Sequence, residues 1–210
     1  MDLTKHIKDS IWSADIETSK LHPMILALDG MSSIKNRHLL NNILDIPDGN
    51  YLEIGVHKGS TFISALYKNK HNSAYAIDDW SQFDEDGIVK REFLKNCKYF
   101  DIRNYLLIEG DCFSVDKNKI SYPINVYFYD GYHSIESTSK ALTYFYDILD
   151  EEFIFIVDDY DWEEPHQGVL QGIAACDLTI EFEQHLKANC ASDKDSWWNG
   201  VGILLLKKKE

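Results

Sequence analysis

The stretch that decides the fold is Tyr51–Leu52–Glu53–Ile54–Gly55–Val56–His57–Lys58–Gly59–Ser60. It begins as a short apolar run, breaks into a turn with two glycines, and ends on a hydroxyl residue that can begin a helix. An acid near a strand end, followed by glycines that let a ligand approach the backbone, is typical of a loop that holds a nucleotide-like molecule. We therefore expect a cofactor at this turn, and we expect Ser60 to cap the helix that follows.

From Asn50 onward, strand-like segments alternate with helix-like segments. This alternation predicts an α/β, Rossmann-like, doubly wound and mostly parallel sheet of seven strands, covered by helices on both faces. The predicted strands are residues 51–54, 73–77, 105–108, 124–129, 153–157, 178–182 and 201–206. The last two are close in sequence and joined by a polar loop, so we expect them to be antiparallel. Helices are expected at about residues 60–67, 85–97, 135–149 and 165–175, with Ser134 capping the third.

We interpret residues 1–210 as one domain, with an N-terminal helical segment at 1–48 and a core at 49–206. Two weak helical patterns, at residues 7–16 and 33–44, precede a turn at Pro47–Asp48–Gly49. Such a segment extends the core, contacts another subunit, or forms a lid over the site. The first two roles are favoured, because terminal segments are usually ordered by docking.

Charge and composition exclude several classes of function. The 21 basic and 35 acidic residues give a formal net charge of −14, which argues against nucleic acid or an anionic membrane as a partner. There is no signal-peptide pattern and no apolar run of membrane-spanning length. The four cysteines lack CxxC spacing, which argues against a zinc site or a disulfide framework. We expect a cytoplasmic protein that acts on a small molecule, and homo-oligomer formation stays open.

Acidic residues gather where the predicted strands end, at Asp78–Asp79, Asp111, Asp130 and Asp158–Asp159. In open parallel sheets, ligands bind beyond the carboxyl ends of the strands, so these acids are candidate site residues. Asp78 also follows Glu53 at about the spacing at which an acid binds ribose in dinucleotide folds.

These motifs resemble class I S-adenosylmethionine-dependent methyltransferases over roughly residues 50 to 206. The resemblance is carried by Glu53-x-Gly55-x-x-x-Gly59-Ser60, Asp78, Gly110–Asp111 and Asp130. The run Asp130–Gly131–Tyr132–His133–Ser134–Ile135–Glu136 is similar to the D-G-x-H-S-Y-E pattern of a bacterial branch of small-molecule methyltransferases, and Val157–Asp158–Asp159–Tyr160 resembles the aspartate pair of macrocin-type, metal-dependent O-methyltransferases. His57 departs from the middle glycine that many members carry, and Ile135 departs from the tyrosine of that branch.

The resemblance implies that S-adenosylmethionine is the cofactor. The implied binding residues are Glu53, Gly55, Val56, Gly59, Ser60, Asp78, Asp79, Trp80, Asp111, Cys112, Phe113 and Asp130. Among them, Asp78 would hold the ribose hydroxyls, Trp80 or Phe113 would pack on the adenine, and Asp111 or its adjacent backbone would meet the adenine amino group. Physically, glycine allows close backbone approach and a carboxylate accepts two hydroxyls at once.

Asp130, Asp158 and Asp159 are expected at the ends of two neighbouring strands. Three convergent carboxylates repel one another unless protons or a cation neutralise them, which makes Mg²⁺ a candidate cofactor held by these three residues. Such an ion would lower the pKa of an acceptor hydroxyl, and His133 is the candidate base that collects its proton, together with Asp130 in the catalytic group. The alternative is that the acids cap helices or bind loop amides, and that His133 stabilises its loop.

The sequence therefore predicts an O-methyltransferase that acts on a small hydroxylated molecule of sugar or natural-product type, with help from a divalent metal. One alternative is a dinucleotide-dependent oxidoreductase, although the turn lacks the tight glycine triplet that binds pyrophosphate. Another is a nucleotide-binding protein of this fold without catalysis.

Overall fold

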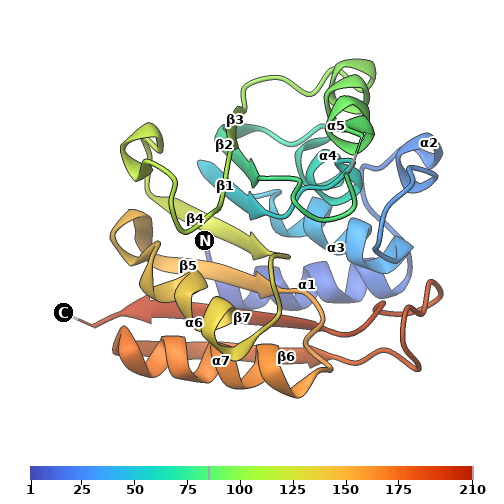
Figure 1. Cartoon of the computed structure of the whole chain (residues 1–210). Helices are drawn as coiled ribbons and strands as arrows, with labels where there is room; N and C mark the ends of the chain where they lie inside the picture. Colours follow the sequence, from blue (N-terminus) through green and yellow to red (C-terminus); the bar gives the residue numbers. More distant parts are fainter. Residues whose placement is uncertain (85, 210) are drawn as a thin grey trace.

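A computed structural model describes residues 1–84 and 86–209 (Figure 1). Its centre is a seven-stranded sheet in the order β3-β2-β1-β4-β5-β7-β6. The strands are Gly49–Ile54 (β1), His71–Asp78 (β2), Leu106–Glu109 (β3), Ile124–Tyr129 (β4), Leu149–Val157 (β5), Leu178–Leu186 (β6) and Val201–Lys208 (β7). The prediction of a Rossmann-like, mostly parallel sheet is confirmed.

The order of the strands positions the site. β1 pairs in parallel with β2 on one side and with β4 on the other, so the chain reverses its direction of winding beside β1. Gly55 N donates to Ile77 O (2.9 Å) and Asp130 N donates to Ile54 O (3.0 Å), which extends the pairing into the loops beyond these strands. The loops after β1, β2 and β4 therefore meet at one edge of the sheet, where this fold binds its ligands.

The C-terminal strands run against the rest of the sheet. β7 is antiparallel to both β5 and β6, and Figure 1 shows it pointing opposite to β4 and β5. The expected antiparallel pair is thus confirmed. Because β7 starts beside the end of β5, the loop between β6 and β7 reaches the same edge as the loops after β4 and β5.

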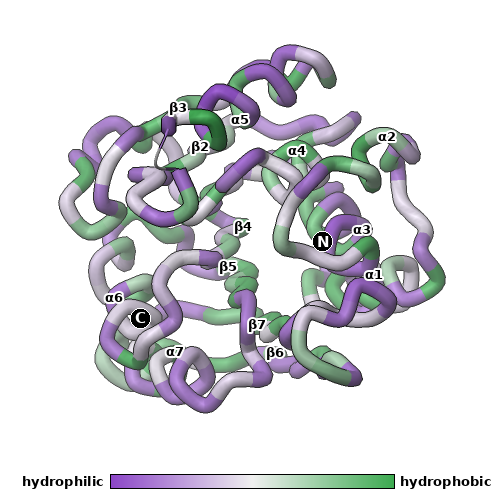
Figure 2. Tube along the Cα trace, turned by 45° about the vertical axis from the view of Figure 1, so that its right-hand side comes forward, coloured by the Kyte–Doolittle hydropathy of each residue, from purple (hydrophilic) through white to green (hydrophobic). Residues whose placement is uncertain are grey.

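Seven α-helices are described: Leu3–Asp15 (α1), Pro23–Leu26 (α2), Ile34–Ile43 (α3), Ser60–Leu66 (α4), Ile88–Tyr99 (α5), Ile135–Thr143 (α6) and Glu163–Ala175 (α7). Side chains alternate along each strand, so β4 sends Val126 and Phe128 to the core shared with α1 to α5, and Tyr127 and Tyr129 to the core shared with α6 and α7. Figure 2 shows hydrophobic residues concentrated where the central strands lie side by side, with hydrophilic loops around them.

Several helix boundaries differ from the sequence prediction. Ser60 does not cap α4 but is its first residue, because Gly59 takes the capping position in a left-handed conformation at φ +86°. Ser134 does cap α6, accepting a hydrogen bond from Ser137 N at 3.2 Å. The helix predicted at 135–149 ends at Thr143, and a 3₁₀ turn, Tyr146–Ile148, leads into β5. α5 begins at Ile88, and Glu85, where that helix was expected to start, lies outside the described residues.

The N-terminal segment packs on the core. Ile7 of α1, Leu39 and Leu40 of α3 and Phe62 of α4 belong to one buried cluster. The buried guanidinium of Arg37 donates from Nη1 to the carbonyl oxygens of Leu26 (2.9 Å), at the end of α2, and of Leu28 (2.7 Å), in the connection to α3. Within the described residues, no helix is long and apolar enough to cross a membrane.

Candidate functional site

The turn after β1 has an unusual backbone. Gly55 and Gly59 have φ of +84° and +86°, and His57 between them is also left-handed at +46°. A Cβ on Gly55 would lie 2.0 Å from the carbonyl oxygen of Asp130, so only glycine lets the turn touch the end of β4. We call residues 55–59 the glycine turn.

Asp78, at the end of β2, holds the glycine turn in place. Its Oδ2 accepts from His57 N (2.8 Å) and its Oδ1 accepts from Trp80 N (2.7 Å). Burial raises the pKa of this carboxyl group, and the two amide hydrogen bonds act in the opposite direction. Each carboxylate oxygen can accept a second hydrogen bond, which is what the expected ribose contact requires.

The indole of Trp80 is buried against the core and is not an open surface on which an adenine could stack. Its indole Nε1 donates to His57 O (3.1 Å), its ring lies 5.9 Å from that of Phe93, and only 7% of the residue is exposed. The indole therefore anchors the glycine turn from the core side. The expected adenine contact of Trp80 stays a prediction.

Glu53 is completely buried behind the turn. Tyr51 Oη donates to its Oε2 (2.5 Å) and Thr61 Oγ1 donates to its Oε1 (2.6 Å). Burial raises its pKa to about 8, despite these two donors. Glu53 thus joins β1 to the start of α4, and it shapes the turn without reaching the surface.

The remaining cofactor candidates lie in turns at neighbouring strand ends. Asp111 accepts from Phe113 N (3.0 Å) and from Ser114 Oγ (2.7 Å), which orders the turn after β3. Phe113 is half-buried, with its ring edge-on to Tyr144. Three further residues are predicted to bind the cofactor. Val56 is buried, Cys112 is half-buried, and the Asp79 carboxylate accepts a hydrogen bond from Ser81 N.

Across the glycine turn lies a cluster of Asp130, His133, Asp158 and Asp159, which we call the acid–histidine group. His133 Nε2 is 3.3 Å from Asp159 Oδ2 and 3.7 Å from Asp130 Oδ1. The ring of His133 also meets Trp162 edge-on, with centroids 5.6 Å apart. The sequence prediction that these strand ends meet is confirmed, because β4 and β5 are neighbours.

Burial dominates the electrostatics of this group. Burial raises the pKa of Asp130, Asp158 and Asp159 and lowers the pKa of His133. Repulsion from neighbouring acids raises the pKa of Asp130 and Asp158 further. The group therefore favours neutral forms. Within the part of the chain that the structure describes, two buried atoms of this group, Asp158 Oδ1 and His133 Nδ1, have no hydrogen-bond partner. Buried polar atoms are normally paired, so both are suited to a ligand.

The described residues contain no set of three or more histidine, cysteine or acidic side chains arranged to hold a metal ion. In particular, Asp159 already uses Oδ1 to accept from Asn199 Nδ2 (2.8 Å), while its Oδ2 faces His133. The expected Mg²⁺ site is therefore not ready-formed in this arrangement.

Asn199 is the site residue that sequence reasoning missed. It lies in the loop between β6 and β7, far from every motif in the sequence, and no local pattern marks it. Only the antiparallel pairing of β5 with β7 brings it beside Asp159.

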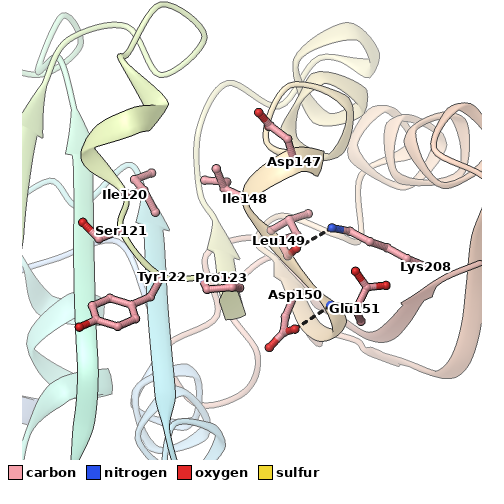
Figure 3. A pocket seen from close by; sticks show the side chains of 10 residues that line it. All are labelled: Ile120, Ser121, Tyr122, Pro123, Asp147, Ile148, Leu149, Asp150, Glu151 and Lys208. Atoms are coloured by element: carbon pink, nitrogen blue, oxygen red, sulfur yellow. Dashed lines mark hydrogen bonds between the residues drawn. The ribbon is translucent and has the colours of Figure 1, made fainter.

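Two cavities lie at the opposite edge of the sheet, away from this group. One, of about 340 Å³, is bordered by Tyr122 before β4, Asp150 in β5 and Lys208 at the end of β7 (Figure 3). Lys208 Nζ donates there to Leu149 O at 2.6 Å. The other, of about 640 Å³, lies near Lys68 and His71 at the start of β2. Neither includes a sequence-predicted site residue.

Comparison with known proteins places these features in a family. The family described as "Methyltransferase domain" matches residues 52–160, just over half of the chain, which includes the glycine turn and the acid–histidine group. No curated protein sequence matches.

Several solved structures share the fold. The O-methyltransferase TomG from Streptomyces achromogenes, in complex with SAM, aligns with a TM-score of 0.66 at 12% identity, covering 99% of each chain. A putative O-methyltransferase from Klebsiella pneumoniae aligns at 0.57 and 14%, covering 99% of this chain and 90% of that one. TrmK of M. capricolum, with S-adenosyl-homocysteine, aligns at 0.57 and 16%, covering 81% of this chain and 68% of that one.

Proposed function

Since the chain belongs to the methyltransferase domain family, we propose that it transfers the methyl group of S-adenosylmethionine to a hydroxyl group of a small molecule. The observation that carries the proposal is the contact between Gly55 and the carbonyl of Asp130. This contact makes the glycine turn and the acid–histidine group adjacent, so a methyl donor and a proton acceptor can share one site.

The glycine turn fits the cofactor. The two left-handed glycines let the backbone turn sharply between β1 and α4, and Asp78 retains acceptor capacity for hydroxyl groups. In this proposal the methionine part lies near Gly55, Gly59 and Ser60, and the ribose lies at Asp78. The solved complex of TomG with SAM, which shares the fold, supports the same choice of cofactor.

S-adenosylmethionine, when bound, supplies an electrophilic methyl carbon whose bond to sulfur breaks, with the electron pair leaving to the sulfur, as the new oxygen–carbon bond forms. The chain must accept the hydroxyl proton. His133 is suited to this role, because burial keeps its imidazole neutral and ready to bind a proton. Asp159, whose Oδ2 lies 3.3 Å from Nε2, acts against burial by raising the pKa of His133, and it therefore favours the imidazolium that results.

The acceptor class rests on charge. Solved structures with this fold include an rRNA methylase as well as O-methyltransferases, so the fold alone does not choose among acceptors. A net charge of −14 disfavours a nucleic-acid backbone, and we therefore assign a small hydroxylated acceptor of sugar or natural-product type. The family match favours methyl transfer over the dinucleotide oxidoreductase that the sequence left open.

Metal assistance is a separate part of the proposal. Asp158 Oδ1 has no hydrogen-bond partner among the described residues, and the three buried acids repel one another; both observations support a divalent cation held by Asp130, Asp158 and Asp159. Such an ion would polarise the acceptor hydroxyl. The proton transfer described above does not depend on it.

Isothermal titration of the full chain with S-adenosylmethionine tests the proposal. We expect one binding event per chain, and no heat at millimolar cofactor would refute the assignment. Formation of S-adenosylhomocysteine is then followed with a panel of sugars and phenols, comparing wild type with His133→Gln. Loss of turnover with unchanged cofactor affinity supports the base role, and equal turnover contradicts it.

A further inference from the structure

Asn199 is held beside the acid–histidine group by the backbone. Asp161 N donates to Asn199 O (3.0 Å) and Tyr160 N donates to Gly200 O (3.1 Å), which continues the pairing of β5 with β7 into the loops. Gly200 permits this approach, since a Cβ there would lie 2.5 Å from Asp161 Cγ. The position of Asn199 relative to Asp159 is thus fixed by main-chain bonds.

The side-chain amide of Asn199 has one satisfactory orientation. Its Oδ1 accepts from Ser192 N (2.6 Å), so its Nδ2 must face Asp159 Oδ1, to which it donates at 2.8 Å. The opposite orientation would place a donor against the amide of Ser192 and an acceptor against a carboxylate. Both Asn199 and Asp159 are buried, so water does not substitute easily for either bond.

Asp159 has two oxygens with different partners. Oδ1 is held by Asn199, which leaves Oδ2 directed toward His133 Nε2 at 3.3 Å. The backbone of Asp159 is left-handed at φ +53°, a conformation that persists only where the surroundings fix it. A continuous series of contacts therefore runs from Ser192 through Asn199 and Asp159 to His133.

We propose that Asn199 is a positioning residue for His133, acting by holding the Asp159 carboxylate so that Oδ2 faces the imidazole. The role given to His133 rests on the proposed function, but the positioning itself rests on the hydrogen bonds. The loop between β6 and β7 is then part of the catalytic arrangement, although it lies outside the residues that the family match covers.

The same loop offers a matched control. Ser196 is as buried as Asn199, with 7% of each residue exposed. Its Oγ donates to Asp193 Oδ2 (2.7 Å) and accepts from Asn189 N (3.2 Å), which orders the loop without touching Asp159. Ser196→Ala therefore loosens the loop, whereas Asn199→Asp keeps the acceptor for Ser192 N, removes the amide donor to Asp159 and adds a carboxyl group beside it.

The test follows the histidine side chains of the full-length protein by ¹⁵N and ¹³C NMR at fixed pH. The eight histidines are resolved as ring signals, and His133 is assigned by its loss in His133→Gln. We expect Asn199→Asp to displace the ring signals of His133 and to leave those of distant histidines, such as His38, in place. Ser196→Ala should leave the signals of His133 where they are in wild type.

Unchanged His133 signals in Asn199→Asp, or an equal displacement in Ser196→Ala, would overturn the proposal. Asn199→Ala removes the donor without adding a charge, carries the same expectation and also serves if circular dichroism shows that Asn199→Asp does not fold. A displacement of the His133 signals in Asn199→Asp but not in Asn199→Ala would be an effect of the added charge and would also overturn the proposal. Titration of wild type with S-adenosylmethionine separates the two claims. Absent cofactor binding refutes the proposed function, whereas the NMR result alone decides the role of Asn199.

Discussion

The ammonium of Lys58 in the glycine turn lies 2.7 Å from the carboxylate of Asp29, which belongs to the N-terminal segment. A second contact lies beside it, because a Cβ on Gly30 would come within 2.1 Å of Ser60 Oγ. Residues 29–30 therefore rest directly on the start of α4. The assignment of the N-terminal segment to the core rather than to a lid stays a prediction.

Arg37, rather than Lys58, should carry the stability of this contact. Asp29 is 81% exposed in its side chain, and exposed ion pairs contribute about 0–1 kcal/mol. Arg37 is buried, and its guanidinium donates to Ser32 Oγ and to the carbonyl oxygens of Ile25, Leu26 and Leu28. Arg37→Met should lower the free energy of unfolding by about 2–3 kcal/mol. Urea denaturation measures this, with Lys58→Met as the control, and equal losses in both variants would contradict it.

Gly55→Ala should disable the glycine turn. The new Cβ would collide with the carbonyl of Asp130, and the residue would also keep a left-handed backbone, which costs about 1–2 kcal/mol for other amino acids. Gly87→Ala is the matched control. It has a similar φ of +65°, but its nearest neighbour is the flexible end of Arg91.

We expect Gly55→Ala to reduce affinity for S-adenosylmethionine at least tenfold in calorimetric titration, while Gly87→Ala changes it little. Affinities that fall equally in both variants would show that the backbone strain, and not the contact with Asp130, is responsible.

Sequence patterns predict this fold well where a buried strand is a continuous apolar run in the sequence. The strand at 124–129 has the bounds of β4, because a continuous apolar run followed by Asp130–Gly131 marks both its burial and its end. The hydroxyl of Ser60 alone predicts this residue as the cap of α4. The sequence does not reveal that Gly59 adopts the left-handed conformation that takes that position.

Some residues of the candidate site can be predicted from the sequence and others cannot. The acids at strand ends can be predicted, and the strand order brings Asp130 and Asp159 together. Asn199 and Arg37 are not visible, because each acts through partners that lie far away in the chain or through backbone carbonyls, which leave no residue pattern. Tertiary placement alone gives them their roles.

Glu53 should make stability depend on pH. Its pKa is raised from 4.5 to about 8 in the folded chain, so between these values the folded protein retains a proton that the unfolded chain releases. Stability contributed by this group is therefore full below about pH 4.5 and is lost as pH rises toward 8, at no more than about 1.4 kcal/mol per pH unit. Glu53→Gln should reduce this slope. Urea midpoints at pH 5, 6, 7 and 8 measure it, and parallel curves for the two proteins would contradict the assignment.

His57 should tolerate glycine better than a branched side chain. Its backbone is left-handed at φ +46°, and both main-chain bonds, from His57 N to Asp78 and from Trp80 Nε1 to His57 O, survive substitution. We expect His57→Gly to change the melting temperature little or to raise it, because the strain is relieved. His57→Val should lower it by several degrees, because branched residues strongly disfavour this conformation. A lower melting temperature for glycine than for valine would contradict the argument.

Asp158 offers the sharpest test for a divalent cation. A ligand that binds only the folded state raises the melting temperature as its concentration increases. Asp158 Oδ1 has no hydrogen-bond partner in residues 1–84 and 86–209. If it contributes to a cation site, millimolar Mg²⁺ should raise the melting temperature of wild type and EDTA should reverse the effect. Asp158→Asn keeps the size of the side chain but removes its charge, and it should abolish the response. Asp193→Asn, at a half-buried position in the loop between β6 and β7 and outside the acid–histidine group, is the control that should respond as wild type does. A response that survives in Asp158→Asn would place the cation elsewhere. No response in wild type would leave neutralisation of the three acids to protons, consistent with the raised pKa values of Asp130, Asp158 and Asp159.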